Sequence, residues 1–314
     1  MDLLVTNKDD YFNIIGYPFN KFNSMYFNDL NKGNTEEVHY FLFKNNKYRL
    51  GLIAGVKNKI LSSPFSAPFG GFSFIKSEVK IRFLEEAIAL LENWASSNGI
   101  SKCQFTLPPL FYHDTFIAKE INSLFTSNYV VDKIDLNFHF EIADFNDNYE
   151  QNIWHSARKS LNKSKSKNLT FKKCTKKSEN KLAYSIIKTN RSKRGFPLRM
   201  EYYDINKTDE VIDKDFFLVY TKDSKPIASA IVFHLSNNVV QVVYWGDDPD
   251  YSHLSVMNFI SYNIFQYYSK QDIKYIDIGP STENSLPNYG LCEFKESIGC
   301  KIVPKYTFVK NIES

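Results

Sequence analysis

The hydrophobic pattern is most regular in the segment from Asp215 to Ser281. Three apolar runs are separated only by short polar turns, which predicts three consecutive antiparallel strands at residues 216–220, 227–235 and 239–245. After a polar loop, apolar residues recur from Leu254 to Tyr268 with the spacing of one helical face. Residues 275–278 then form a short apolar run. The segment therefore predicts a unit of three strands, a loop, a helix and a buried strand.

The same order occurs earlier in the chain, in a first copy about 175 residues before this segment. Its predicted strands are residues 38–43, 49–56, 60–65 and 103–107. A loop rich in Pro and Gly follows the third strand, and an apolar stripe from Ile81 to Trp94 predicts the helix. The chain is therefore interpreted as a duplication with two domains, 1–145 and 146–314, which meet in the acidic, Asn-rich loop 144–148.

The remaining segments predict further elements with mixed spacing. Helical patterns occur at 21–30, 116–125, 149–167 and 182–187, and strand patterns at 129–142 and 301–309. Long antiparallel runs together with a strand–helix–strand connection in each copy indicate mixed sheets. The expected fold class is α/β with mixed sheets in two tandem domains.

Composition limits the class of protein. A length of 314 residues with 43% hydrophobic residues suits two ordinary cores. The four cysteines are far apart and form no CxxC pair, so neither a zinc site nor a disulfide framework is expected, and a reducing compartment fits. No apolar run approaches the length of a membrane span, and the first residues lack the features of a signal peptide. These features are typical of a soluble cytoplasmic protein.

Positive charge is concentrated in one stretch, although the formal net charge is only +4. Nine of the twenty residues from Arg158 to Lys177 are Lys or Arg, and none is acidic. This stretch is either a solvated helix face with an edge strand or a wall that binds the phosphates of a nucleotide, RNA or acidic lipid. Because aromatic residues do not interleave with it in the manner of a base-stacking platform, recognition of single-stranded nucleic acid as the main role is disfavoured.

A second basic cluster lies at residues 191–194, before Gly195. Cations at a helix C-terminus interact favourably with the helix dipole, so a structural role is one interpretation. The other is a loop that presents Arg191 and Arg194 to a phosphate or carboxylate, because guanidinium groups suit bidentate contacts.

Three segments give the chain a resemblance to the FemABX-like acyl- and aminoacyltransferases, which have a tandem Gcn5-related N-acetyltransferase (GNAT) fold. These segments are the basic helix and following strand at 157–171, the stretch 189–197, and the stretch 288–299 with Asn288-Tyr289-Gly290-Leu291, Phe294-Lys295 and Gly299. The repeated order of strands and helix is also the core order of the GNAT fold. Together with the duplication, the resemblance covers most of the chain.

The resemblance implies transfer of an acyl or aminoacyl group to an amine. It implies that Phe294 and Lys295 lie at the reaction centre, with substrate held by Arg158, Lys159, Arg191, Arg194 and Tyr289. The chain lacks the inserted coiled-coil hairpin associated with tRNA-using members, so acyl-CoA is the expected donor and aminoacyl-tRNA the less favoured one.

Two features count against CoA. GNAT enzymes hold the pyrophosphate on a glycine-bearing loop between the third strand and the helix, at the helix N-terminus. In the first copy Gly70 and Gly71 allow close approach of a cofactor or simply supply a turn, but the basic-led motif is missing. In the second copy the equivalent loop carries Asp247, Asp248 and Asp250, which repel phosphate.

The chemistry can also be assigned from the residues themselves. Acyl transfer builds negative charge on the carbonyl oxygen and removes a proton from the amine. Lys295 would stabilise the oxyanion, with Phe294 buried and Lys295 exposed on an extended segment facing a groove between the domains. Asp247 or Asp248 would accept the proton. The alternative interpretation of Lys295 is an ordinary surface lysine, and that of the two aspartates is a solvated acidic loop without a catalytic role. The scattered histidines and cysteines give no triad pattern.

Three functions follow from the sequence. The first is an N-acyltransferase acting on an amino sugar or another cell-envelope or polysaccharide precursor, carried on a nucleotide or lipid. The second is a non-catalytic GNAT-like scaffold that binds an anionic glycan precursor or a protein partner. The third is an aminoacyl-tRNA-dependent aminoacyltransferase.

Overall fold

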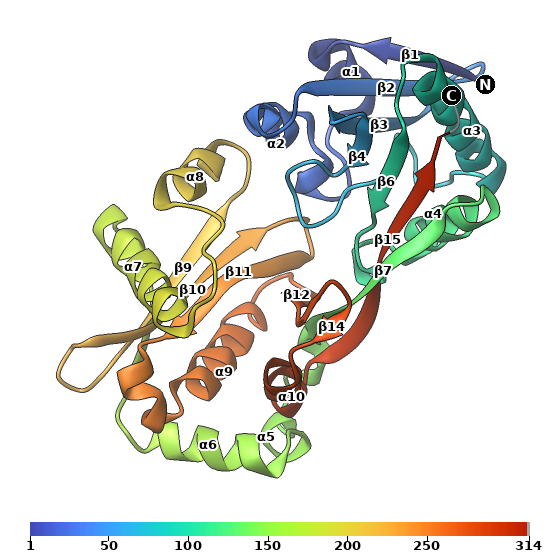
Figure 1. Cartoon of the computed structure of the whole chain (residues 1–314). Helices are drawn as coiled ribbons and strands as arrows, with labels where there is room; N and C mark the ends of the chain where they lie inside the picture. Colours follow the sequence, from blue (N-terminus) through green and yellow to red (C-terminus); the bar gives the residue numbers. More distant parts are fainter. Residues whose placement is uncertain (313–314) are drawn as a thin grey trace. The chain divides into compact units, whose positions relative to one another are not determined.

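The computed structural model describes residues 1–312 and divides them into two compact units (Figure 1). Unit 1 consists of Met1–Leu136 together with the chain from Val303 onward, and unit 2 consists of Asn137–Ile302. Unit 1 is thus discontinuous in sequence, because the chain returns to it after completing unit 2, whereas the expected domains were each continuous. Within the described residues, no helix combines the length and apolar character needed to cross a lipid bilayer.

The sheet of unit 1 has the strand order β1-β2-β3-β4-β6-β15, with β5 paired to β3. All neighbours are antiparallel except β4 and β6, which are parallel. The strands are β1 (Asp2–Thr6), β2 (Glu37–Lys44), β3 (Tyr48–Lys57), β4 (Ile60–Ser63), β5 (Ser73–Phe74), β6 (Lys102–Thr106) and β15 (Lys301–Asn311). The strand next to β6, β15, therefore comes from the far end of the chain.

The helices of unit 1 are α1 (Lys8–Ile15), α2 (Met25–Leu30), α3 (Ile81–Ser97) and α4 (Asp114–Thr126), with 3₁₀ turns η1 (Lys21–Asn23), η2 (Lys32–Asn34) and η3 (Leu110–Tyr112). Helix α3 buries Leu84, Ile88 and Leu91, which share one face at a spacing of three to four residues. These side chains pack against the apolar side chains of β2 and β3, including Phe41 and Leu52. This contact forms the main core of unit 1.

The sheet of unit 2 has the order β7-β12-β11-β10-β9-β8. Only β11 and β12 are parallel, and the other neighbouring strands are antiparallel. The strands are β7 (Val130–Glu141), β8 (Thr170–Lys173), β9 (Lys214–Tyr220), β10 (Pro226–His234), β11 (Val239–Asp247) and β12 (Tyr275–Pro280), followed by a small hairpin of β13 (Thr282–Glu283) and β14 (Leu286–Pro287).

Helices cover both faces of this sheet (Figure 1). On one face, Ser229 of β10 donates a hydrogen bond to the Ala183 carbonyl of α7. On the other face, the Phe217 ring of β9 contacts Tyr267 and Tyr268 of α9. Helix α6 packs on α9. The helices are α5 (Tyr149–Asn152), α6 (His155–Lys165), α7 (Lys177–Arg194), α8 (Tyr202–Lys207), α9 (Val256–Tyr268) and α10 (Tyr289–Ser297), with 3₁₀ turns η4 (Ile142–Asp144), η5 (Thr208–Glu210) and η6 (Pro249–Leu254).

The predicted duplication and fold class are confirmed. Each unit contains three antiparallel strands, a helix, and a last strand parallel to the third strand of the unit. The parallel pairing is short in both units: it runs from Ile60–Lys102 to Ser63–Phe105 in unit 1 and from Val239–Tyr275 to Gln241–Asp277 in unit 2. Beyond these pairs the third and last strands are no longer hydrogen-bonded to each other.

Several local predictions were wrong. The single helix expected at 149–167 is two helices, because Ile153 leaves the helical conformation between α5 and α6. The helix expected at 21–30 is interrupted at Ser24, whose side chain caps α2. Strand β1 and helix α1 were not predicted; most of β1 is exposed, and only Tyr11 and Ile15 of α1 are buried.

A buried carboxylate joins four elements at one end of the sheet of unit 2. Asp215 of β9 accepts hydrogen bonds from His234 of β10 (2.8 Å) and Tyr268 of α9 (2.7 Å), and it forms an ion pair with Lys173 of β8 (2.6 Å). Burial alone would raise the pKa of Asp215, but the three donors more than offset this and hold its pKa at about 2.

The first prediction is that Asp215→Asn lowers the free energy of unfolding by about 3 kcal/mol, because it leaves buried partners of a charge unpaired. Since the pKa is lower in the folded state, the stabilisation by Asp215 is fully present above the unfolded pKa of 3.8 and is lost as the pH falls toward 2. Urea unfolding at pH 7 and pH 3 measures both effects. The control is Asp223→Asn in the exposed β9–β10 turn. Equal stability of the two variants would contradict the assignment.

Candidate active site

The candidate site is built around the point where β11 and β12 separate in unit 2. Gln241 and Asp277 form the last parallel pair. The Asp277 carboxylate is fully buried and accepts hydrogen bonds from Gln241 Nε2 (2.7 Å), from Asn137 Nδ2 of β7 (2.8 Å) and from the Gly279 backbone N–H (2.8 Å). One carboxylate thus connects three neighbouring strands at the last residue pair before β11 and β12 separate.

The backbone turns immediately after this carboxylate. Gly279 has a φ of +69°, and the register between β12 and β7 shifts between Asp277 and Gly279. A residue with a Cβ is strained in this conformation, whereas glycine adopts it readily. The turn directs the carbonyl groups of Ile278, Gly279 and Pro280 toward one side chain, Lys295.

Lys295 lies on α10 and is only 2% exposed. Its ammonium group donates to the carbonyl oxygens of Ile278 (2.9 Å), Gly279 (2.9 Å) and Pro280 (3.2 Å), and it lies 5.0 Å from the Phe138 ring centroid. The three N–H donors of the ammonium group are therefore matched by three carbonyl oxygens. Burial lowers the pKa of Lys295 to about 8, opposed by the nearby Cys300 and Asp277. The amine is still predominantly protonated at neutral pH.

The expected arrangement of Phe294 and Lys295 is reversed. The segment is helical and not extended, so neighbouring side chains do not point to opposite sides as in a strand. Lys295 points into the core of unit 2, and Phe294 is half-buried with its ring edge toward Trp245 of β11, 6.0 Å between centroids. The resting ammonium group has its donors committed to carbonyl groups and is not a free surface charge.

The end of α7 supplies two arginines to the same region. Arg194 forms an ion pair with Asp247 (3.0 Å), and Asn190 donates to the Asp247 carbonyl oxygen (2.6 Å) and carboxylate (3.1 Å). Asp247 is therefore buried and held in a fixed orientation at the end of β11. Arg194 and Asp247 were both predicted site residues, and the structure brings them together.

Arg191 is different because it has no acidic partner among the described residues. Its half-buried guanidinium lies between the rings of Phe196 (5.9 Å) and Tyr244 of β11 (5.7 Å). Burial lowers its pKa, Tyr244 opposes this, and the charge of Arg199 lowers it further. Arg191 in turn contributes to the lowered pKa of Lys295. Two desolvated cations thus lie close enough to interact at the separation of β11 and β12.

Other predicted residues lie elsewhere. Arg158 and Lys159 are on α6, on the α9 side of the sheet, whereas α7 covers the other face, so the four basic residues do not form one cluster. Arg158 donates to the Gln151 carbonyl oxygen (3.4 Å), and Lys159 is exposed. Tyr289 begins α10 and is 73% exposed.

The loop before α9 is acidic in the folded protein as well. Lys193 forms ion pairs with Asp248 (3.2 Å) and Asp250 (3.0 Å), so it partly neutralises these carboxylates. No basic side chain of α9 itself lies in the first turn. This loop offers little to a pyrophosphate.

In unit 1 the gap where β4 and β6 separate is filled by the loop that follows β4. After β4, the loop returns so that the Gly70 N–H donates to the Thr106 carbonyl of β6 (2.8 Å) and the Gly71 N–H to Ser63 Oγ (3.1 Å). Both glycines are buried, and a Cβ at Gly70 would lie 2.7 Å from the Pro64 nitrogen. The expectation that Gly70 and Gly71 bind a cofactor is therefore not supported, because they pack against protein.

Structural comparison identifies the fold. No protein-family model and no curated protein matches the sequence. A crystal structure of FemX superposes with a TM-score of 0.70 at 11% identity, covering 99% of this chain and 97% of that one. The chain has a FemX-like tandem GNAT fold.

Two further structures share this FemX-like fold. One is the C-terminal domain of a putative lysylphosphatidylglycerol synthetase from Agrobacterium fabrum, with a TM-score of 0.57, 11% identity, and coverage of 84% of this chain and 81% of that one. The other is a tandem GNAT protein from the clavulanic acid biosynthesis pathway, with a TM-score of 0.52, 5% identity, and coverage of 100% and 99%. At these identities the comparisons establish the fold, which agrees with the resemblance found in the sequence.

Sequence reasoning missed several residues of the candidate site in this FemX-like fold. Gln241 and Asp277 were included in predicted strands but not as functional positions. A signal was present, because each is a polar residue inside an otherwise apolar buried strand, and buried polar groups require partners. Asn190 lay in the stretch 189–197 that carried the resemblance, but its contact with Asp247 and that of Tyr244 with Arg191 could not be predicted, because both depend on how α7 packs on β11.

The second prediction concerns the ionisation of Lys295, tested with Lys295→Met. Its pKa is about 8 in the folded state and 10.5 for an ordinary lysine, so the folded protein releases the proton first. The stability of the wild type relative to Lys295→Met should therefore increase as the pH rises from 8 to 10.5, by up to about 3 kcal/mol. Guanidinium unfolding at pH 7.5 and 10.5 measures the difference.

The control for this experiment is Lys159→Met, which removes an exposed lysine from α6. Both variants are compared with the wild type at the two pH values. A pH-independent difference for Lys295→Met would show that the folded and unfolded pKa values of Lys295 are equal.

Proposed function

We propose that the protein transfers an acyl or aminoacyl group to a primary amine, with the reaction at the separation of β11 and β12 in unit 2. The observation that carries this proposal is the asymmetry between the two copies. In unit 1 the separation of the strands is closed by Gly70 on Thr106. In unit 2 it is bordered by Arg191, which has no acidic partner among the described residues, and by Trp245 and Phe294.

The reaction needs two electrostatic contributions. The amine nitrogen forms a bond to the acyl carbon, the bond from that carbon to the leaving atom breaks, and one proton passes from the amine to the leaving group. Negative charge develops on the acyl oxygen, and fixed cations stabilise it in a water-poor site. Lys295 supplies a fixed positive charge from below the strand ends, and Arg191 has donor groups available for a substrate phosphate or carboxylate.

Asp247 is the proposed acceptor of the amine proton. Asn190 and Arg194 fix the orientation of the Asp247 carboxylate, so a bound amine would meet it in a single geometry. Arg194 also keeps a positive charge beside the Asp247 carboxylate. The residues that would bind the acceptor are Arg191 and Arg194, together with Tyr289 and Phe294 at α10.

The donor favoured by the geometry is an aminoacyl group carried on a polyanion such as tRNA. Acyl-CoA, the donor favoured by the sequence, needs a pyrophosphate site before α9, where Asp248 and Asp250 lie. The basic stretch 158–177 gives unit 2 a cationic surface that suits a longer polyanion. One protein of similar fold is also named as a lysylphosphatidylglycerol synthetase, a name that denotes attachment of a lysyl group to a lipid.

The proposed acceptor is the amine of an amino sugar or of a nucleotide- or lipid-linked precursor of an envelope glycan. The experiment is incubation of the full chain with aminoacyl-tRNAs or acyl-CoAs against a panel of nucleotide-linked amino sugars, with products detected by mass spectrometry. A new amide with an aminoacyl-tRNA supports the proposal as stated, and one with only an acyl-CoA reverses the choice of donor. Absence of any amide in all combinations, with anion binding retained, favours the non-catalytic scaffold.

The third prediction is that Arg191→Met lowers kcat/KM about 10- to 100-fold for the productive donor and acceptor, because a hydrogen bond to a charged group contributes about 1.5–3 kcal/mol. The methionine keeps an apolar contact with Phe196 and Tyr244, so the thermal unfolding midpoint should change little. Lys181→Met is the control, since it removes an exposed cation from the same helix. Equal loss in both variants would indicate a general charge effect.

A further inference from the structure

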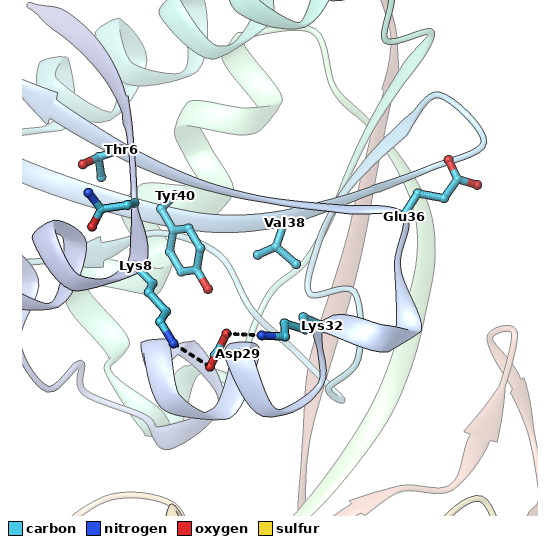
Figure 2. Close-up of a pocket in the computed structure, with 8 residues that line it drawn as sticks. Thr6, Lys8, Asp29, Lys32, Glu36, Val38 and Tyr40 are labelled. Atoms are coloured by element: carbon cyan, nitrogen blue, oxygen red, sulfur yellow. Dashed lines mark hydrogen bonds and ion pairs between the residues drawn. The ribbon is translucent and has the colours of Figure 1, made fainter.

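The interior of unit 1 contains a polar cluster that the proposed reaction does not use. The larger hollow on the surface of this unit, about 430 Å³ beside β1 and β2, has its two lysines balanced by Asp29 and Glu36 (Figure 2). The polar cluster lies instead around residues 64–72, which follow β4 and are called the closing loop. The space left beside Gly70 and Gly71 is only about 10 Å³, room for a single water molecule, so the closing loop fills the gap between β4 and β6.

The end of the closing loop is tied to four elements. The hydrogen bonds of Gly70 to β6 and of Gly71 to β4 are joined by two others. Asn23 Nδ2 of η1 donates to the Gly71 carbonyl (3.2 Å), and the Phe72 N–H donates to Glu120 Oε1 of α4 (2.8 Å). Gly71 has a φ of +106°, and a Cβ there would lie 2.8 Å from Glu120 Oε1, so glycine is what lets the carboxyl approach the loop. Among these contacts only the Glu120 carboxyl can exchange a proton at moderate pH.

The Glu120 carboxyl is buried without a cation. Glu120 is 1% exposed, and its second oxygen, Oε2, has no hydrogen-bond partner among the described residues. The Ser123 hydroxyl, one turn further along α4, is also buried without a partner in the described part of the chain. An ionised carboxylate here would lose its hydration for a single N–H in return, so the protonated form is the stable one. Burial accordingly raises the pKa of Glu120 well above its ordinary value of 4.5, opposed by the Phe72 N–H.

The titratable groups around Glu120 do not compensate its charge. Lys119 of α4 and Lys305 of β15 each donate to a backbone carbonyl, at 2.7 Å and 3.5 Å, and His113 caps α4 through Nδ1. Within the described residues none of them forms an ion pair with Glu120. The same holds for the other titratable side chains of the neighbouring elements, which are Asp114 of α4, Lys21 of η1, Tyr112 of η3, Arg82, Glu85, Glu86 and Glu92 of α3, and Lys102 and Cys103 of β6.

We propose that Glu120 is a proton-dependent latch on the closing loop of unit 1. With the carboxyl protonated, the Phe72 N–H stays bonded to α4 and the loop fills the gap where β4 and β6 separate. Loss of the proton leaves a charge that the interior cannot hold, so the loop detaches, the carboxylate reaches water and the gap opens. The corresponding separation in unit 2 borders the candidate active site, but the latch does not depend on the reaction proposed there.

The fourth prediction is tested by amide hydrogen exchange of the full chain between pH 5 and pH 8, expressed as protection factors, which remove the intrinsic effect of pH on exchange. The closed state holds the proton more tightly than the open state, so rising pH favours opening. The protection factors of Gly71 and Phe72 should therefore fall by about tenfold per pH unit between the ordinary and the raised pKa of Glu120. Glu120→Gln keeps the acceptor oxygen but cannot ionise, so its protection factors should be independent of pH. Glu85→Gln, at an exposed position of α3, should behave as the wild type.

A second measurement reads the proton directly in the wild type. The carbon-13 signal of the Glu120 carboxyl should report a protonated group at pH 5.5, about one unit above the ordinary pKa of a glutamate. An ionised carboxyl at this pH, or wild-type protection factors that do not change with pH, would overturn the latch. An equal pH dependence in Glu120→Gln would assign the opening to another group and overturn it as well. If Glu120→Gln does not fold, the carbon signal and the wild-type protection factors still decide the question.

Discussion

The buried carboxylate of Asp277 determines the geometry on which the candidate site depends. A charged group in a dry interior is tolerated only when its oxygens are saturated, and here Gln241, Asn137 and the Gly279 N–H do so. Each donor comes from a different strand or from the turn that follows, so the same bonds that neutralise the cost of burial also fix where β11 and β12 separate. The carbonyl groups that hold Lys295 follow directly after this point.

Duplication has given two units with one plan and different chemistry. In both, the third and last strands pair for only a few residues and then separate. Unit 1 satisfies the exposed backbone of β6 with the loop that carries Gly70, whereas unit 2 satisfies the backbone of β12 with an ammonium group. The Gly70 loop of unit 1 is uncharged and fills the gap between the strands. In unit 2 the buried ammonium group of Lys295 places a positive charge near the aromatic side chains of Trp245 and Phe294. Only the second arrangement suits the charge that develops in acyl transfer.

The cation that lacks an acidic partner lies in unit 2. Arg191 is half-buried near the rings of Phe196 and Tyr244, and no carboxylate among the described residues pairs with it. A partly desolvated cation without an acidic partner is costly to maintain, because the lost hydration is not repaid within the protein. This is the physical basis for assigning anionic recognition to Arg191.

The sequence by itself determined the duplication, the fold class and the order of the main elements, because alternation and helical spacing depend on which face each residue buries. It also marked Arg191, Arg194, Asp247 and Lys295 as chemically relevant. The tertiary structure alone decided that Lys295 is buried on a helix, that Gly70 closes a gap, and that Arg158 lies on the other side of the sheet from Arg191. These outcomes depend on contacts between residues far apart in the chain, and a local pattern carries no information about which distant carbonyl or ring a side chain will meet.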